Sequence, residues 1–252
     1  MNPTIFVPLV FFVIALVFSM LGMGGSQLYI PILFWAGLDF KTEAIPLGML
    51  LNVINSGSAT VTYARRKLIV WRTALPLAGA MMAFAPLGVW LNVRIPVQPL
   101  LVFFAAFTAA AGLLMLSGWR PADSALSPCG RTILGAAGGS GLGLVAGLIG
   151  RGGGSFVVPL LVIFGVGAKA AAATSAFVVT CSGISSLVSH VATGARPSWG
   201  WWVACVASVF AGSQIGSRWM ADRMKPRSVK LVFGIVLLGV AAVILVKDVL
   251  IA

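Results

Sequence analysis

The chain has 252 residues, of which 60% are hydrophobic and only 9% are charged, and its mean hydropathy is +1.06. A soluble globular domain carries about 25% charged residues, so this composition excludes an ordinary soluble fold and predicts an integral membrane protein. The net charge of +12 does not indicate nucleic-acid binding, because the lysines and arginines of a membrane protein collect in its cytoplasmic loops.

Apolar segments follow one another along the chain, and most reach the 17–25 residues that a helix needs to cross about 30 Å of hydrocarbon. The first segment has no basic residue before its apolar run, so we expect a retained membrane helix and not a cleaved signal. Two segments of about a dozen residues would rise only about 18 Å as helices, too little to span. The segments are roughly 2–20, 26–37 (short), 44–64, 72–92, 97–118, 132–149, 155–166 (short), 170–193, 198–217 and 229–247.

The chain repeats itself at an offset of 128 positions without a gap. Chance explains a few matches among apolar residues, but it explains poorly a set of glycine, proline, lysine and tryptophan matches in one register. We therefore predict two homologous halves, residues 1–118 and 132–252, joined by a polar linker at 119–131. The matched pairs are Gly22 and Gly150, Gly24 and Gly152, Gly25 and Gly153, Pro31 and Pro159, Gly37 and Gly165, Lys41 and Lys169, Ser58 and Ser186, Trp71 and Trp199, and Gly88 and Gly216.

Basic residues collect at 65–67, 120–131 and 218–230, and we expect these three loops on the cytoplasmic side. The loop at Arg196 then lies outside, although the repeat makes it the counterpart of 65–67. Equivalent loops on opposite sides indicate an inverted repeat, provided that each short segment either forms a re-entrant hairpin with the helix before it or crosses outright. We predict an all-α membrane fold of two inverted halves, each with about four full transmembrane helices and a short re-entrant half-helix.

Each short segment follows a glycine-rich stretch, GMGG at 22–25 and GRGGG at 150–154. Glycines let backbone amides turn into a cavity, and a helix that starts there presents free N–H groups and a partial positive charge, which suit an anion. Arg151 adds a full charge and a forked donor that fits oxyanions. The alternative is a loop in water, with Arg151 reaching a lipid headgroup. The candidate residues are Gly22, Gly24, Gly25, Ser26, Gln27, Gly150, Arg151, Gly152, Gly153, Gly154 and Ser155.

Small polar side chains on the next helix of each half are further candidates, because polar groups inside a bilayer usually face the bundle. We expect Asn52, Asn55, Thr174 and Ser175 to line the site, and helix–helix contact is the alternative role. His190, the only histidine, is a candidate proton relay, and an interfacial histidine without a role is the alternative.

The positions of the acids favour an anionic cargo. All five acidic residues lie in predicted loops or at helix ends, so a cation inside the membrane would have no counter-charge, whereas an anion would have Arg151 and two helix N-termini. One histidine and no carboxylate in mid-helix leave no nucleophile–base pair and no metal ligands. We therefore expect no enzymatic activity, no metal and no cofactor.

A stripe of small residues follows the linker. Gly135, Gly139, Gly143 and Gly147 recur at every fourth position, which lets another helix approach closely. The partner is either a helix of the same bundle or a second copy of the chain in a homodimer.

These features resemble the TauE/SafE family of sulfite exporters over nearly the whole chain. The specific part is the ordered recurrence in both halves of a glycine-rich turn, a short segment with a proline, a Gly–x₃–Lys element and a small polar helix. The resemblance implies a bacterial inner-membrane carrier of small sulfur-containing or carboxylated anions, and members are linked to sulfite, sulfoacetate and related organosulfonates. The halves differ at two places. The first half has Met23 where the second has Arg151, and it has PLGMLLN (46–52) where the second has the more family-like TSAFVVT (174–180).

We therefore expect a secondary transporter that moves a small oxyanion, such as sulfite or an organosulfonate, by alternating access, with the second half holding the anion. An anion channel on the same scaffold and a carrier of small carboxylates are the alternatives. The expected partners are the anion, in one version with a coupled proton, and membrane lipid; nucleic acid is not expected.

Overall fold

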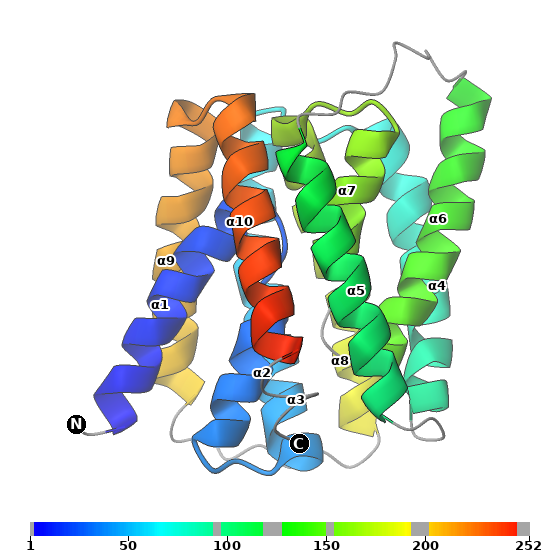
Figure 1. Ribbon diagram of the computed structural model, residues 1–252. Helices are drawn as coiled ribbons and strands as arrows, with labels where there is room; N and C mark the ends of the chain where they lie inside the picture. The colour runs from blue at the N-terminus through cyan, green and yellow to red at the C-terminus, as the bar shows by residue number, and fades with distance from the viewer. Residues whose placement is uncertain (1–2, 93–96, 118–127, 150–153, 193–201, 246–252) are drawn as a thin grey trace.

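The computed structural model describes residues 3–92, 97–117, 128–149, 154–192 and 202–245. Within these ranges the chain is helical and has no strand, which confirms the all-α class (Figure 1). A π-helical turn, η1 (Phe40–Ala44), precedes α3. The α-helices are α1 (Pro3–Leu21), α2 (Ser26–Trp35), α3 (Ile45–Arg65), α4 (Trp71–Asn92), α5 (Val97–Leu116), α6 (Pro128–Ile149), α7 (Gly154–Ile163), α8 (Ala168–Ala192), α9 (Trp202–Arg223) and α10 (Pro226–Ile244).

Several helices are suited to a bilayer. Among the described residues, four stretches are long and apolar enough to cross a membrane, within α3 with the turn before it, α4, α8 and α10. The short helices α2 and α7 have 10 residues each, as the sequence predicts. Large apolar side chains, such as Leu9, Val188 and Val203, are exposed on the flanks of the bundle, where lipid would cover them. The chain is a multi-pass membrane protein.

The last basic cluster differs from its prediction as a loop. Arg218 and Arg223 lie on α9, which continues beyond the predicted end at 217, and α10 already begins at Pro226. The apolar pattern ends at the first charged residue, but the helix continues. An arginine near a helix end keeps its guanidinium group in water while the backbone hydrogen bonds of the helix continue. Similarly, α6 begins at Pro128, inside the predicted linker, since proline suits the first position of a helix.

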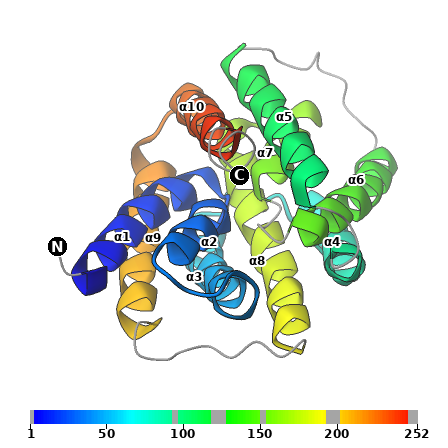
Figure 2. The same ribbon diagram turned by 60° about the horizontal axis from the view of Figure 1, so that its bottom comes forward.

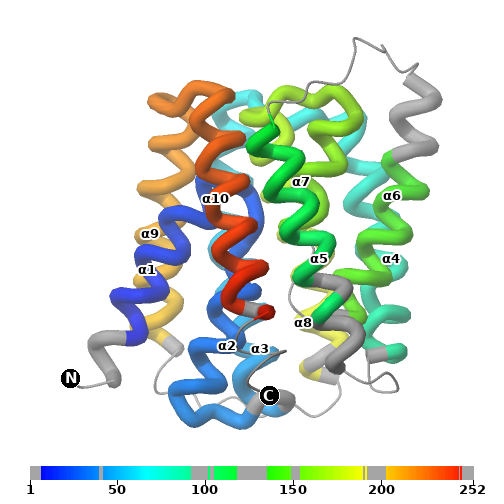
Figure 3. Tube along the Cα trace, viewed as in Figure 1, coloured from blue at the N-terminus to red at the C-terminus, as the bar shows by residue number. Residues whose placement is uncertain are grey.

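The helices alternate in direction, and the Cα trace follows the same course (Figures 1 and 3). α1 enters from the lower end of the bundle and ends inside it, and α2 returns to the lower end. α3 then runs upward, α4 downward and α5 upward. In the second half, α6 runs down from the upper end, α7 returns to it, and α8, α9 and α10 run downward, upward and downward. Each short helix therefore leaves the bundle at the end where the preceding helix entered.

The two predicted halves interlock and do not pack as separate bodies. The most extensive helix contacts are α4 with α6, α1 with α9, α3 with α8 and α5 with α10, and each joins a helix of the first half to one of the second. Viewed from the lower end, α8 crosses the middle, with α1, α2, α3 and α9 on one side and α4, α5, α6 and α7 on the other (Figure 2). Each half thus needs the other to bury its apolar surface.

The glycine stripe of α6 packs against α4. A Cβ added to Gly147 would lie 2.1 Å from the carbonyl oxygen of Ala85, and one added to Gly143 would lie 2.8 Å from the backbone of Met81. Only a residue without a side chain allows backbones this close. The packing interpretation of the stripe is confirmed, and a homodimer would have to use another surface.

We expect Gly147→Ala to lower the thermal unfolding midpoint of the purified protein in detergent by about 5 °C. The added methyl group must push α4 away from α6, and overpacking of this kind costs about 1–3 kcal/mol, with about 2–4 °C per kcal/mol in a chain of this size. Gly141→Ala, on the same helix, is the control because its added Cβ meets nothing within 4 Å. Equal midpoints for the two variants would contradict the packing described here.

Candidate functional site

The turn between α1 and α2 can form only with glycine. Gly22, Gly24 and Gly25 have φ angles of 69°, 84° and 104°, in the left-handed region that residues with a Cβ rarely adopt. The space is also closed, since a Cβ on Gly24 would lie 2.1 Å from Oδ1 of Asn52. The turn ends α1 inside the bundle and sets the first N–H groups of α2 against the next helix.

Two amide side chains of α3, one helical turn apart and both fully buried, hold this turn. Oδ1 of Asn52 accepts a hydrogen bond of 3.2 Å from the N–H of Ser26, the first residue of α2. Nδ2 of Asn55 donates to the carbonyl oxygen of Gly24 and, at 3.3 Å, to the hydroxyl of Tyr29. Because these partners are a backbone N–H and a backbone C=O, they fix which end of each amide is oxygen and which is nitrogen.

The second half completes the site from the opposite side. Nε2 of Gln27 donates to Oγ of Ser155, and Oγ of Ser175 donates to the carbonyl oxygen of Gly22 at 2.8 Å. Gly154, the first residue of α7, lies against the backbone of Met23, where an added Cβ would come within 2.3 Å of the carbonyl oxygen. The first turns of α2 and α7 therefore meet. We call Ser26, Gln27, Asn52, Asn55, Ser155 and Ser175 the central polar cluster.

Three buried atoms of the central polar cluster have no hydrogen-bond partner among the described residues: Oε1 of Gln27, Nδ2 of Asn52 and Oδ1 of Asn55. A buried polar atom without a partner costs about 1–3 kcal/mol, so three such atoms in one cluster make it a candidate binding place for water or a polar ligand. Two helix N-termini each add about half a positive elementary charge there. The arrangement can hold a small anion that both accepts and donates hydrogen bonds.

Most of the predicted site residues that the structure describes come together in this way. Thr174 is the exception, because its buried hydroxyl accepts a hydrogen bond of 3.0 Å from the N–H of Val70, next to the start of α4. Gly150, Arg151, Gly152 and Gly153 lie outside the described residues, and His190 lies on α8 with its side chain outside them as well. Substrate binding by any of these residues stays a prediction.

Sequence reasoning missed two polar contacts of the cluster. Tyr29 is buried with its hydroxyl at Asn55, and Ser213 of α9 donates from Oγ to the carbonyl oxygen of Asn55 at 2.7 Å. Ser213 lies inside an apolar segment. The rule that polar groups within a bilayer face the bundle, which selected Asn52 and Ser175, would also have selected Ser213 if it had been applied to α9. Tyr29 carries no comparable signal, since a tyrosine in an apolar run is as compatible with a membrane interface.

Comparison with known proteins gives one family. The sequence model of the family described as "Sulfite exporter TauE/SafE" matches residues 7–244. The probable membrane transporter protein y4hK of Sinorhizobium fredii is 29% identical over 225 residues, 84% of this chain and 87% of that protein. The probable membrane transporter protein YunE of Bacillus subtilis is 24% identical over 245 residues, 87% and 89% of the two chains. A probable membrane transporter protein of Xylella fastidiosa is 32% identical over 157 residues, 57% of each chain. No solved structure matches.

We expect Asn55→Ala to lower the thermal unfolding midpoint by several degrees, because the carbonyl oxygen of Gly24 would stay buried without its donor, at a cost of about 1–3 kcal/mol. Ser140→Ala is the control, since the hydroxyl of Ser140 bonds to the carbonyl of Ala136 in its own helix and to no other element that the structure describes. If both variants unfold at the wild-type midpoint, Asn55 does not hold the turn.

Proposed function

Because the chain belongs to the TauE/SafE family of sulfite exporters, we propose that it is a secondary transporter that carries a small sulfur-containing oxyanion, such as sulfite or an organosulfonate, across the inner membrane by alternating access. One observation carries the proposal. The N-termini of two short helices, one from each half, meet at the central polar cluster, where three buried amide atoms have no partner in the described part of the chain. Discontinuous helices of this kind bind substrates in transporters.

The charge at the cluster suits an anion of one or two charges. Two helix N-termini supply about one positive elementary charge in total. Arg151 is four residues before Ser155 in the sequence, and in our proposal its guanidinium adds a second charge and two parallel donors. A monoanion is then balanced by the helices alone, whereas a dianion depends on Arg151.

The amide atoms without a partner in the described part of the chain favour an oxyanion that carries a proton. Nδ2 of Asn52 can donate to an oxyanion oxygen, whereas Oδ1 of Asn55 and Oε1 of Gln27 can only accept. A protonated anion, or an anion with a bridging water, supplies the donor that these two oxygens need. No buried acid is then required for proton coupling, because the proton crosses on the cargo.

We also propose that the two halves are an inverted repeat, and equivalent contacts support this. Gly88 of α4 faces the carbonyl of Leu144 on α6, and Gly216 of α9 faces the carbonyl of Leu16 on α1, with added Cβ atoms at 2.2 and 2.1 Å. These two contacts are related by the 128-residue offset. Gln27 and Ser155, which touch, are equivalent positions themselves. Helices at equivalent positions also run in opposite directions (Figure 1).

The orientation follows from the basic residues. The C-terminal ends of α3 and α9 lie at the upper end of the bundle in Figure 1, and Arg66 and Asp222 form an ion pair of 2.9 Å between them. The clusters at 65–67 and 218–230 are therefore at one end. By the positive-inside rule we propose that this end is cytoplasmic.

Reconstituted protein should show saturable uptake and counterflow of sulfite or sulfoacetate in proteoliposomes, and an imposed pH gradient should change the rate if the cargo crosses in a protonated form. The panel should include sulfate and small carboxylates as competitors. Unitary currents without saturation would indicate a channel instead, and uptake restricted to carboxylates would overturn the sulfur-oxyanion assignment.

Asn52→Asp is expected to lower uptake and anion affinity at least tenfold while the fold is kept. An aspartate retains the oxygen that accepts from Ser26 but replaces the free donor with a negative oxygen, and the N-terminus of α2 favours its ionised form. Arg151→Ala should do the same, and Arg151→Lys should recover only part of the activity because lysine lacks the fork. Wild-type uptake in Asn52→Asp and in Arg151→Ala would contradict the assignment of the site.

A further inference from the structure

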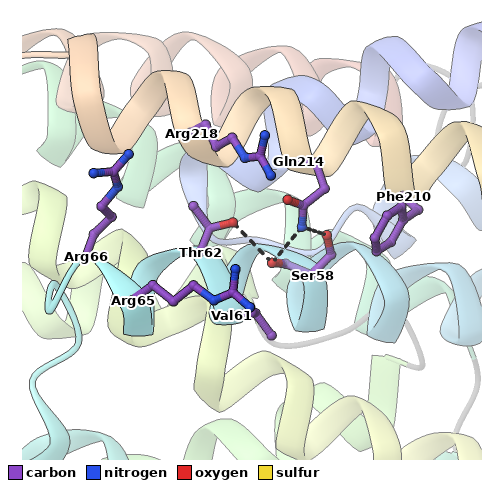
Figure 4. A pocket seen from close by; sticks show the side chains of 8 residues that line it. All are labelled: Ser58, Val61, Thr62, Arg65, Arg66, Phe210, Gln214 and Arg218. Carbon is purple, nitrogen blue, oxygen red and sulfur yellow. Dashed lines mark hydrogen bonds between the residues drawn. The ribbon is translucent and has the colours of Figure 1, made fainter.

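A second polar site lies between α3 and α9, near the upper end of the bundle. It is a pocket of about 790 Å³, and the side chains around it come from both helices (Figure 4). Arg65, Arg66 and Arg218 stand around its charged end, and Val61 and Phe210 form half-exposed apolar walls further down. Neither the 128-residue repeat nor the glycine turns predict this pocket.

The floor of the pocket is polar and ordered. Nε2 of Gln214 donates to Oγ of Ser58 at 2.6 Å and to its carbonyl oxygen at 3.3 Å. Beside them, Oγ of Ser217 donates to Oγ1 of Thr62 at 3.2 Å. These bonds join α3 to α9, so the polar part of the pocket is built into the interface between the two helices.

The positive charge of the pocket is only partly balanced. Arg66 is paired with Asp222, whereas Arg65 and Arg218 have no acidic partner in the part of the chain that the structure describes. In Figure 4, their side chains extend toward the pocket from α3 and α9. Both side chains are exposed, so solvent screens the repulsion between their charges. An anion between them would add attraction, and their forked donors match the oxygens of an oxyanion.

The three arginines of the pocket have no charged equivalents in the other half of the repeat. At the offset of 128 positions, Arg65, Arg66 and Arg218 correspond to Thr193, Gly194 and Trp90, none of which is charged. The scaffold shared by the two halves therefore does not require these charges. The positive-inside rule explains why basic residues collect at one end of the bundle, but it does not explain why they surround a pocket.

We propose that the α3–α9 pocket is a second oxyanion site, distinct from the central polar cluster, in which Arg65 and Arg218 bind the anion. The ligand is either the free cargo at the mouth of its path or the phosphate of an anionic lipid whose acyl chain lies along Val61 and Phe210. For the free cargo, the inference rests on the proposed function. Polar contacts between α3 and α9 then continue from the pocket toward the central polar cluster, because Gln214 bonds to Ser58 and Ser213 bonds to the carbonyl of Asn55.

The test uses the purified full chain in nanodiscs of phosphatidylcholine, at constant ionic strength set with chloride. Two probes are titrated separately, sodium sulfite and short-chain phosphatidylglycerol, and short-chain phosphatidylcholine, which is zwitterionic and has no net charge, is the reference. The shift of the unfolding midpoint gives an apparent Kd. The double variant Arg65→Gln/Arg218→Gln is compared with Arg223→Gln/Arg227→Gln, which removes the same charge from positions that are also exposed but do not line the pocket. Each protein without probe should unfold near the wild-type midpoint.

We expect the pocket variant to weaken binding of at least one probe about tenfold and the control variant to leave both unchanged, since each lost guanidinium removes a charge-assisted pair. Titrating sulfite into the Asn52→Asp variant separates the two sites. If sulfite still shifts the unfolding midpoint of Asn52→Asp but not that of Arg65→Gln/Arg218→Gln, the sulfite binds in the pocket. Loss of the phosphatidylglycerol response alone identifies the lipid phosphate as the ligand. Equal weakening in both double variants, or no response to either probe, overturns the proposal. A failure of Asn52→Asp to alter transport would instead count against the proposed function only.

Discussion

The fold depends on one constraint, which is that a backbone turned inside an apolar bundle must still find hydrogen-bond partners. The turn at Gly22–Gly25 exposes N–H and C=O groups that a continuous helix would satisfy by itself. Asn52 and Asn55 supply two partners from the first half, and Ser175 supplies one from the second. The break in α1–α2 is therefore stable only when both halves are assembled around it, and the residues that satisfy it are the ones that build the site.

Close helix contact provides the rigidity that this assembly needs. Gly88 and Gly216 bring α4 onto α6 and α1 onto α9 at backbone distance, and each contact joins the two halves. Three buried polar atoms without a partner among the described residues cost several kcal/mol, and dispersion along these tightly packed helices offsets such a cost. The tight packing continues into the cluster, where a Cβ on Gly24 would lie 2.1 Å from Oδ1 of Asn52 and one on Gly154 would lie 2.3 Å from the carbonyl oxygen of Met23.

The sequence predicts the elements better than the directions in which their side chains point. The 128-residue offset identifies the short helices, and the glycine turns identify where their N-termini begin. Thr174 and Ser175 show the limit, because neighbours on a helix point about 100° apart and only one of them can face Gly22. Packing selects Ser175 for that contact and turns Thr174 to Val70. Tyr29 and the α3–α9 pocket likewise depend on which helices become neighbours, which no local pattern encodes.

The unequal halves fit the requirements of a carrier better than equal halves would. A carrier must release its anion as readily as it binds it, so the binding energy has to stay limited. In the proposed function, two helix N-termini would give about one positive charge, and Arg151 would raise this to about two. An arginine in place of Met23 would raise it to about three, in a buried space where each charge acts at short range and low dielectric. With methionine at position 23, the proposed site would keep about two positive charges, so that the anion would be held weakly enough to be released.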